Sequence, residues 1–167
     1  KLYKLYKLYK LYKLYKLILT AMNVTLREIN EDNWRECIHL SVGENQKRFV
    51  AINENALALA YAHKEMNPRG IYNDDLLVGF IMYARDPDDG VYYINRLMID
   101  EKYQAKGYGR EALKILIKQL REMRIESVDI IHKPDNEVAI RLYRSFGFEL
   151  TEETLGDDVI SKLKIEK

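Results

Sequence analysis

The chain has 167 residues, of which 47% are hydrophobic and 32% are charged, and its formal net charge is +1. This length suits one domain with a substantial core, and the single cysteine excludes a disulfide framework. Nothing in the sequence directs export, so we expect a cytoplasmic protein.

The first 21 residues differ in composition from the rest. Lys-Leu-Tyr repeats five times over residues 1–15, and a period of three suits neither an amphipathic helix nor an alternating strand. Lysine at every third position excludes a signal-peptide core and a membrane span. We interpret residues 1–21 as a non-native or disordered extension and residues 22–167 as a single folded domain. The alternative is a basic, aromatic arm that binds nucleic acid or a membrane.

The composition of residues 22–167 limits the partners of the domain. Residues 1–21 hold six of the 27 basic residues and no acidic one, so the remainder carries a net charge of −5. A mildly acidic domain argues against nucleic acid and is compatible with a cationic substrate. The three histidines lack metal-ligand spacing, so we predict no metal site. Cys37 shares a predicted helical face with Trp34 and Ile38 and is interpreted as a buried structural thiol.

Hydrophobic periodicity and turn residues predict the elements in chain order. A strand over residues 24–29 precedes a helix that Asn30 caps and that extends to about Ser41. Residues 44–64 are helical or partly helical, and Pro68, Arg69 and Gly70 form a turn. The later strands are predicted over residues 71–72, 76–84, 91–99, 127–131, 148–152 and 159–165, with tight turns at 73–75, 86–90 and 156–157. Two further helices cover residues 108–124, with a buried stripe that includes Met123, and the segment after residue 136.

The segment Gln-Ala-Lys-Gly-Tyr-Gly at residues 104–109 lies between the strand that ends at Ile99 and the next helix. Alternating glycines at a helix start leave backbone N–H groups free and remove side chains that would block a ligand. With the positive end of the helix dipole and Lys106, the segment predicts a cradle for phosphate or pyrophosphate.

The same glycines also fit a dinucleotide fingerprint. Gly107, Gly109 and Ala112 have its spacing, and Asp129 falls where a ribose-binding acid is expected. That fingerprint needs a strand that leads directly into the first glycine, whereas seven residues, 100–106, intervene here. The domain is also too short for a full doubly wound sheet, so we disfavour this alternative.

A second motif covers residues 136–148. Asn136 is a good N-cap, and Gly147 ends the helix and lets the chain reverse. The residues that share one helical face, at positions i, i+3, i+4 and i+7, are Ala139, Leu142, Tyr143 and Phe146.

A Gln-x-x-Gly-x-Gly loop followed by an Asn-x-x-Ala-x-x-Leu-Tyr-x-x-x-Gly-Phe helix resembles the GCN5-related N-acetyltransferase (GNAT) family. The resemblance covers Met22 to the C-terminus and implies an α/β (α+β) fold. This fold has a mixed, mostly antiparallel central sheet of about seven strands flanked by about four helices. It implies an enzyme that moves acetyl from acetyl-CoA (coenzyme A) to a primary amine, and a homodimer formed through the exposed late strands.

The resemblance also implies site residues. In the family, the strand before the loop separates from its neighbour at a bulge, and its backbone pairs with the pantetheine arm. Tyr143 is implied as the general acid to the leaving thiolate, although a tyrosine on an apolar helix face is otherwise a core residue. Ala105 stands where glycine is common, and its methyl is tolerated if φ is negative. The implied cofactor-binding residues are Leu97, Met98, Ile99, Gln104, Ala105, Lys106, Gly107, Tyr108, Gly109, Arg110, Asn136, Ala139, Tyr143 and Arg144.

The acceptor is indicated by the segment 41–46, a long helix and the strand at 77–83, which together resemble bacterial spermine/spermidine acetyltransferases. This implies a polyamine acceptor, with Glu44 as a substrate-binding carboxylate. Asn95 and Arg96 depart from the resemblance, because polyamine enzymes often carry acids there. The carboxylates that could line an acidic rim, or simply form solvated turns, are Asp74, Asp75, Asp88 and Asp89.

Several points stay open at this level. The general base is one of Glu44, Asp100, Glu101 and His132, or a water chain to solvent. The acceptor could be another amine, such as an aminoglycoside, an amino acid or a protein N-terminus. A non-catalytic acyl-CoA-binding module is a further alternative.

Overall fold

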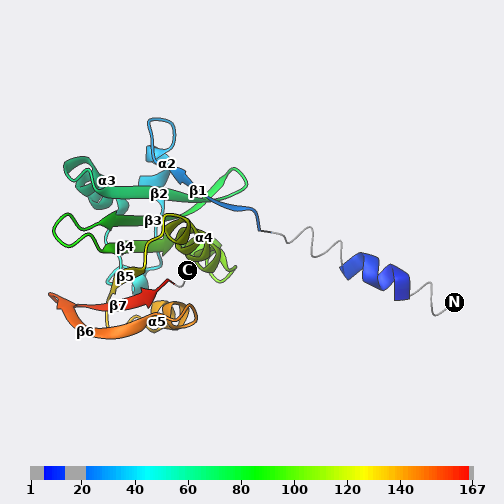
Figure 1. Cartoon of the computed structure of the whole chain (residues 1–167). Coiled ribbons are helices and arrows are strands. Elements are labelled where there is room, and N and C mark those ends of the chain that lie inside the picture. Colours follow the sequence, from blue (N-terminus) through cyan, green and yellow to red (C-terminus); the bar gives the residue numbers. More distant parts are fainter. Residues whose placement is uncertain (1–5, 14–21, 166–167) are drawn as a thin grey trace.

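The computed structural model describes residues 6–13 and 22–165 (Figure 1). Residues 22–165 form a seven-stranded sheet in the order β1-β2-β3-β4-β5-β7-β6, in which only β4 and β5 pair in parallel. The strands are β1 (Val24–Glu28), β2 (Met66–Asn73), β3 (Leu76–Arg85), β4 (Tyr92–Ile99), β5 (Ser127–His132), β6 (Glu149–Leu155) and β7 (Asp158–Lys164). The helices are α2 (Trp34–His39), α3 (Asn53–Ala62), α4 (Tyr108–Glu122) and α5 (Glu137–Arg144), with the 3-10 turns η1 (Glu44–Gln46) and η2 (Glu101–Tyr103). The predicted mixed fold is confirmed.

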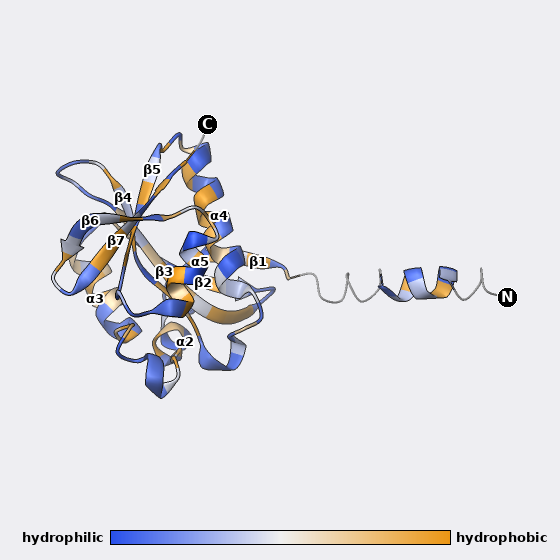
Figure 2. Ribbon diagram, turned by 90° about the horizontal axis from the view of Figure 1, so that it is seen from below, coloured by the Kyte–Doolittle hydropathy of each residue, from blue (hydrophilic) through white to orange (hydrophobic). Residues whose placement is uncertain are grey.

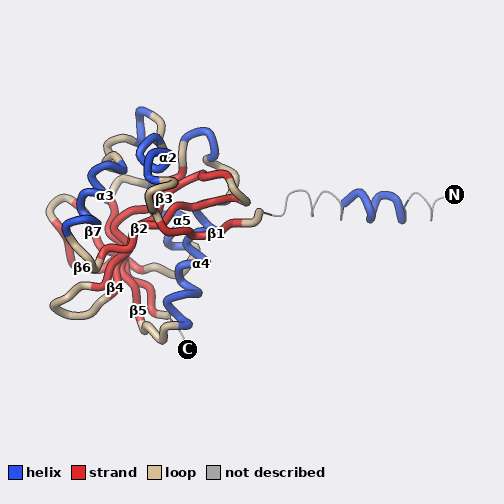
Figure 3. The backbone as a smooth tube through the Cα atoms, turned by 90° about the horizontal axis from the view of Figure 1, so that it is seen from above, coloured by secondary structure: helices blue, strands red, loops and turns tan. Residues whose placement is uncertain are grey.

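Helices cover both faces of the sheet (Figure 3). One core layer joins α4 and α5 to the sheet, and the other joins α2 and α3 to β2 and β3. Cys37 is fully buried in the second layer, and this burial raises the pKa of its thiol to about 12. The thiol is therefore structural, as predicted.

The amphipathic helix α4 places one stripe of apolar side chains against the sheet. The ribbon of α4 alternates between hydrophobic and hydrophilic colours in Figure 2. Its fully or nearly buried residues are Ala112, Leu113, Leu116, Ile117 and Leu120. Met123 was predicted to extend this stripe, but its side chain is 53% exposed because α4 ends at Glu122 and the periodicity ends with it.

The predicted turn at residues 68–70 is wrong, because β2 passes through it without interruption. Proline cannot donate a ladder hydrogen bond and is tolerated only where one strand edge lacks a partner. Pro68 meets this condition: β1 pairs with β2 from Arg69 to Asn73 and does not reach it. The turn lies earlier, where the His63 carbonyl accepts a hydrogen bond from the Met66 backbone N–H.

The sheet divides at β4. Met82 of β3 pairs with Arg96 and Tyr83 pairs with Ile94, so Asn95 is an extra residue that forms a β-bulge. The parallel pairing of β4 with β5 covers only residues 92–94. Beyond the bulge, β4 keeps its β3 partners and turns a free edge toward α5, as the family resemblance implies.

Residues 6–13 of the repeat form a helix in which every residue is exposed. Lys10 lies over the ring of Tyr6 and Lys13 over that of Tyr9, at 5.3 and 5.9 Å from the ring centroids. Lysine and leucine are good helix formers, and these i,i+4 contacts add to that preference. The expectation that the repeat does not suit a helix is therefore wrong for residues 6–13. Residues 1–5 and 14–21 lie outside the described residues.

Candidate active site

The two sequence motifs meet across a cleft of about 570 Å³. The free edge of β4 forms its floor, the glycine loop one wall and α5 another. The predicted site residues that line it are Leu97, Met98, Ile99, Gln104, Ala105, Gly107, Tyr108, Gly109, Arg110, Asn136, Ala139 and Tyr143. Twelve of the fourteen implied cofactor-binding residues thus lie together.

The glycine loop turns through two left-handed residues. Gly107 caps α4 with a φ of +91°, and the first N–H groups of α4 have no acceptor within the helix. A Cβ on Gly109 would already touch Ile99 and Leu142, at 3.6 and 3.8 Å. Ala105 has a φ of +59°, so the expected negative φ is wrong. The loop needs a left-handed residue at this position, and alanine adopts it with strain.

Gln104 fixes this loop to two neighbours. Its Nε2 donates to the Ile99 carbonyl and to Oε1 of Gln46, at 2.9 Å each. The same Gln46 oxygen accepts a hydrogen bond from the Gly43 backbone N–H at 3.2 Å. Gln46 lines the cleft and was not predicted as a site residue, and its only sequence signal was the resemblance of segment 41–46.

Three cationic residues predicted near the cofactor have different positions. Arg110 lines the cleft, and its guanidinium donates to Oγ of Ser145 at 2.9 Å. Lys106 is exposed, donates from Nζ to the Lys102 carbonyl and does not line the cleft. Arg144 lines a separate, smaller pocket that also includes Tyr143. The structure therefore does not bring Lys106 and Arg144 into the cleft with the others.

Tyr143 lies at the junction of two clefts. A second cleft, of about 380 Å³, shares five lining residues with the first: Phe49, Val50, Leu97, Asn136 and Tyr143. Tyr143 is only 6% exposed and packs against the rings of His132 and Phe148. Burial raises the pKa of its phenol, so the hydroxyl stays protonated at neutral pH. A buried proton donor at the junction suits proton transfer between ligands in the two clefts.

The second cleft is rich in cations. Its charged lining residues are Lys47, Arg48, Arg96, Lys133 and Asp158. The Arg96 guanidinium donates to the carbonyls of Ala51 and Ile52, at 2.7 and 2.8 Å, and burial lowers its pKa. The ion pairs at the rim are Lys47–Glu44, Arg48–Asp135 and Lys133–Asp158.

The candidate bases differ in position. His132 lines the second cleft, where one ring nitrogen contacts Oγ of Ser161 at 2.9 Å. Asp100 is buried and accepts hydrogen bonds from the backbone N–H groups of Ser41 and Lys102, which makes it a turn-forming residue. Glu44 lines neither cleft, and its side chain is 86% exposed.

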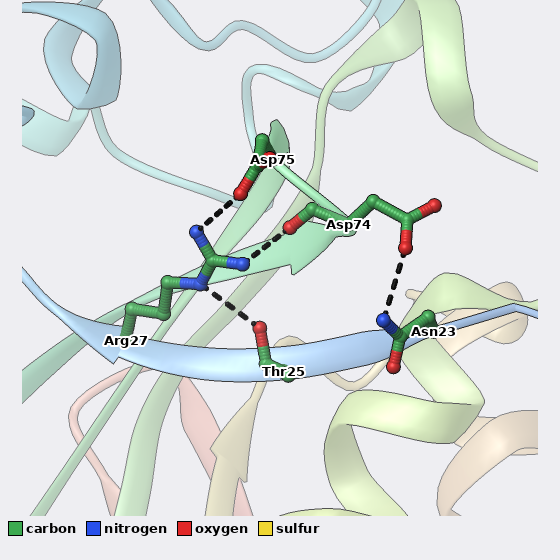
Figure 4. Close-up of polar contacts among 5 residues, drawn as sticks. All are labelled: Asn23, Thr25, Arg27, Asp74 and Asp75. Carbon is green, nitrogen blue, oxygen red and sulfur yellow. Dashed lines mark hydrogen bonds and ion pairs between the residues drawn. The ribbon is translucent and has the colours of Figure 1, made fainter.

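The aspartates of the predicted acidic rim lie in turns. Figure 4 shows Arg27 of β1 donating to Oδ1 of Asp75 and to the Asp74 carbonyl, while Asn23 donates to the Asp74 carboxylate. These contacts hold the β2–β3 hairpin against β1, at the opposite edge of the sheet from β6. Asp89 accepts from the Val91 N–H within its own turn. None of these carboxylates lines either cleft.

The dinucleotide alternative does not fit this architecture. Asp129 lies inside β5, only 8% exposed and 3.6 Å from the ammonium of Lys162. The sheet is largely antiparallel rather than doubly wound. Within residues 6–13 and 22–165, no three His, Cys, Asp or Glu side chains gather as metal ligands. In the same described ranges, no helix has the length and apolar character needed to cross a bilayer.

The chain belongs to the acetyltransferase (GNAT) family, whose family model matches residues 11–148. It is therefore an acetyl-CoA-dependent N-acetyltransferase. It is 32% identical over 139 residues to the spermine/spermidine N(1)-acetyltransferase of Bacillus subtilis (strain 168), across 79% of this chain and 91% of that protein.

Solved structures of similar fold include the ribosomal-protein-S18-alanine N-acetyltransferase of Escherichia coli, at 19% identity and a TM-score of 0.67. That match covers 86% of this chain and 95% of the other. The PaiA N-acetyltransferase of Thermoplasma acidophilum in complex with coenzyme A has 20% identity and a TM-score of 0.64, covering 86% and 99%. These likenesses establish the fold.

Proposed function

We propose that this enzyme acetylates a primary amine of a polyamine, with Tyr143 as general acid. The observation that carries the proposal is the position of Tyr143, buried where the two clefts meet. The first cleft contains both family motifs and would hold acetyl-CoA. The second would hold the acceptor, so the reacting groups of the two ligands would come together beside the phenol.

The residues of the first cleft fit acetyl-CoA. The free edge of β4 at residues 97–99 can pair with the amide-containing pantetheine arm, and the N–H groups at the start of α4 can bind the pyrophosphate. Acetyl-CoA supplies an activated acetyl thioester whose thiolate departs. Gly109 adds no side chain beside Ile99 and Leu142 at the start of α4, so the backbone there can face the ligand.

Tyr143 would give its proton to the departing thiolate. Because burial raises the phenol pKa, the acid form is populated throughout the neutral range and above it. The desolvation that weakens the phenol as an acid also raises the proton affinity of a thiolate beside it. Proton transfer between them therefore stays near balance. The proton lost by the nitrogen leaves through the second cleft, which is open to solvent.

The polyamine acceptor is supported by the relative at 32% identity and by the rim of the second cleft. Glu44 and Asp158 are paired there with lysines that line the cleft, Lys47 and Lys133. A distal ammonium of a polyamine can replace Lys47 at the exposed pair with Glu44, because exposed pairs contribute little stability. We assign Glu44 this role in substrate binding.

The test is a comparison of kcat/KM for spermidine, spermine, butylamine, an aminoglycoside, an amino acid and a peptide, measured by thiol release. Polyamines should give the highest values. Glu44→Gln should raise KM for spermine more than KM for butylamine, while the exposed control Glu31→Gln changes neither. Equal kcat/KM for polyamines and butylamine would contradict the acceptor assignment.

A second candidate acceptor is an amine that also carries a carboxylate, such as an amino acid or a protein N-terminus. The observation that favours it is the excess of cations in the second cleft, four against one carboxylate. Preference for the amino acid or peptide in the same comparison would support this candidate.

We also propose a homodimer formed through β6, the edge strand beside β7. Leu150 and Leu155 of this strand are 61% and 60% exposed, and an exposed strand edge with apolar side chains favours pairing with a second copy. Light scattering should give twice the mass of one chain, and Leu150→Lys should reduce the measured mass to that of one chain. A monomeric wild type would contradict the proposal.

A further inference from the structure

Asn95 lies where β4 separates from β5. It is the bulged residue of β4, directly beyond the last residue that pairs with β5. It lines the second cleft together with Leu97, Ile131 and Tyr143. Bulges in strands re-aim side chains and are common beside active sites.

The side-chain oxygen of Asn95 is buried, and it has no hydrogen-bond partner among the described residues. The amide nitrogen has only a weak acceptor, the Met66 sulfur at 3.7 Å. An unsatisfied buried acceptor costs about 1–3 kcal/mol, so its retention calls for an explanation such as a ligand. A primary amine in the second cleft carries the N–H groups that this oxygen lacks.

The charges around Asn95 favour the neutral form of such an amine. The titratable and charged groups that face the cleft, besides the neutral phenol of Tyr143, are Lys47, Arg48, Arg96, His132, Lys133 and Asp158. The single carboxylate is already paired with Lys133 at 2.9 Å. Neighbouring cations lower the pKa of an ammonium group, so an amine that enters here loses its proton more readily than in water.

We propose that Asn95 is an acceptor-binding residue whose Oδ1 accepts a hydrogen bond from the reacting amine, while the surrounding cations keep that amine unprotonated. This inference rests on the proposed function and identifies how its nucleophile is prepared. The nitrogen lone pair then forms the C–N bond as the C–S bond breaks, and Tyr143 protonates the thiolate. The surplus proton of the nitrogen passes to solvent, and the Tyr143 phenolate regains a proton from solvent. No carboxylate base is required.

The amide is essential to this role. A neutral oxygen holds an N–H of the amine without favouring the ammonium form, whereas a carboxylate would stabilise the ammonium and withhold the lone pair. Asn95→Asp should therefore keep or lower KM but reduce kcat at pH 7 about tenfold, and move the rise of kcat with pH about one unit upward. Asn95→Leu should raise KM about tenfold through the lost hydrogen bond.

The experiment measures kcat, KM and their pH dependence with spermidine and with butylamine at saturating acetyl-CoA. The variants are N95D, N95L and the control N67D, in which the same change is made on β2 at a residue outside the cleft. Thermal unfolding distinguishes a structural role of Asn95 from a role in acceptor binding. Because N95L removes an unsatisfied oxygen, it should be at least as stable as the wild type. N67D should keep the wild-type pH profile.

Wild-type KM, kcat and pH profile in both Asn95 variants would overturn the inference. So would an N95L protein that loses stability and activity together while N95D keeps the wild-type profile, because that pattern marks a structural residue. If the wild type turns over no amine, the proposed function fails and this inference fails with it. If the wild type turns over amines and the Asn95 variants have the same kinetics, this inference is rejected and the proposed function stands.

Discussion

Ala105 offers a direct test of the geometry of the glycine loop. Its φ of +59° lies in the left-handed region, which costs a residue with a Cβ about 1–2 kcal/mol. Glycine removes this strain but adds conformational freedom to the unfolded chain, which costs about 0.4–1 kcal/mol. Ala105→Gly should therefore increase the free energy of unfolding by about 0.5–1 kcal/mol, which raises Tm by about 1–4 °C for a domain of this size.

Urea denaturation and calorimetry of the full chain measure this change. Gly107→Ala is the matched control, because it places a Cβ at a φ of +91° and 3.1 Å from the Met22 methyl group. This variant should lose more than about 1 kcal/mol. Lower stability of Ala105→Gly than of the wild type, or unchanged stability of Gly107→Ala, would refute the left-handed geometry of the loop.

Three further predictions concern stability, cofactor binding and domain organisation. Burial raises the pKa of the Cys37 thiol from 9.0 to about 12, so its stabilising contribution is present below pH 9 and is lost as the pH rises toward 12. Urea titrations should show unfolding free energy falling about 1.4 kcal/mol more per pH unit in this range than in Cys37→Ala, and equal slopes would contradict the shift. Gly109→Leu places a bulky side chain beside Ile99 and Leu142 at the start of α4, so calorimetry should show coenzyme A affinity reduced at least about tenfold, whereas unchanged affinity would remove the loop from the site. Deleting residues 1–21 should leave kcat and both KM values unchanged, and a loss of activity would contradict the proposed boundary of the catalytic domain.

Much of the lining of the first cleft was predictable because its signals are local. The glycine loop and the Asn136 helix each carry their cap, apolar face and stop within one segment. The structure places the Asn136 side chain as the N-cap that accepts from the Ala139 N–H at 3.3 Å, and Gly147 at a φ of +91°. The two motifs then meet across one cleft.

The wrong predictions concern features whose conformation depends on segments that are distant in the sequence. Pro68 is compatible with a strand only because β1 ends before it, which its own neighbours in sequence do not reveal. The left-handed conformation of Ala105 depends on how the loop joins β4 to α4. The second cleft combines the segment before α3 with β4, β5 and β7, so no single segment carries its pattern. The role that we infer for Asn95 depends on a bulge that only strand pairing shows.

The central claim is that Tyr143 is the proton donor at the junction of the two clefts. Tyr143→Phe keeps the buried ring and removes only the hydroxyl, so stability and coenzyme A affinity should match the wild type. Tyr83→Phe, a partly buried tyrosine of β3 that lines neither cleft, is the matched control. Steady-state acetyl transfer to spermidine should show kcat of Tyr143→Phe reduced by about 10²–10⁴-fold at every pH tested, with the control unchanged. Wild-type kcat in Tyr143→Phe across the pH range would contradict the account.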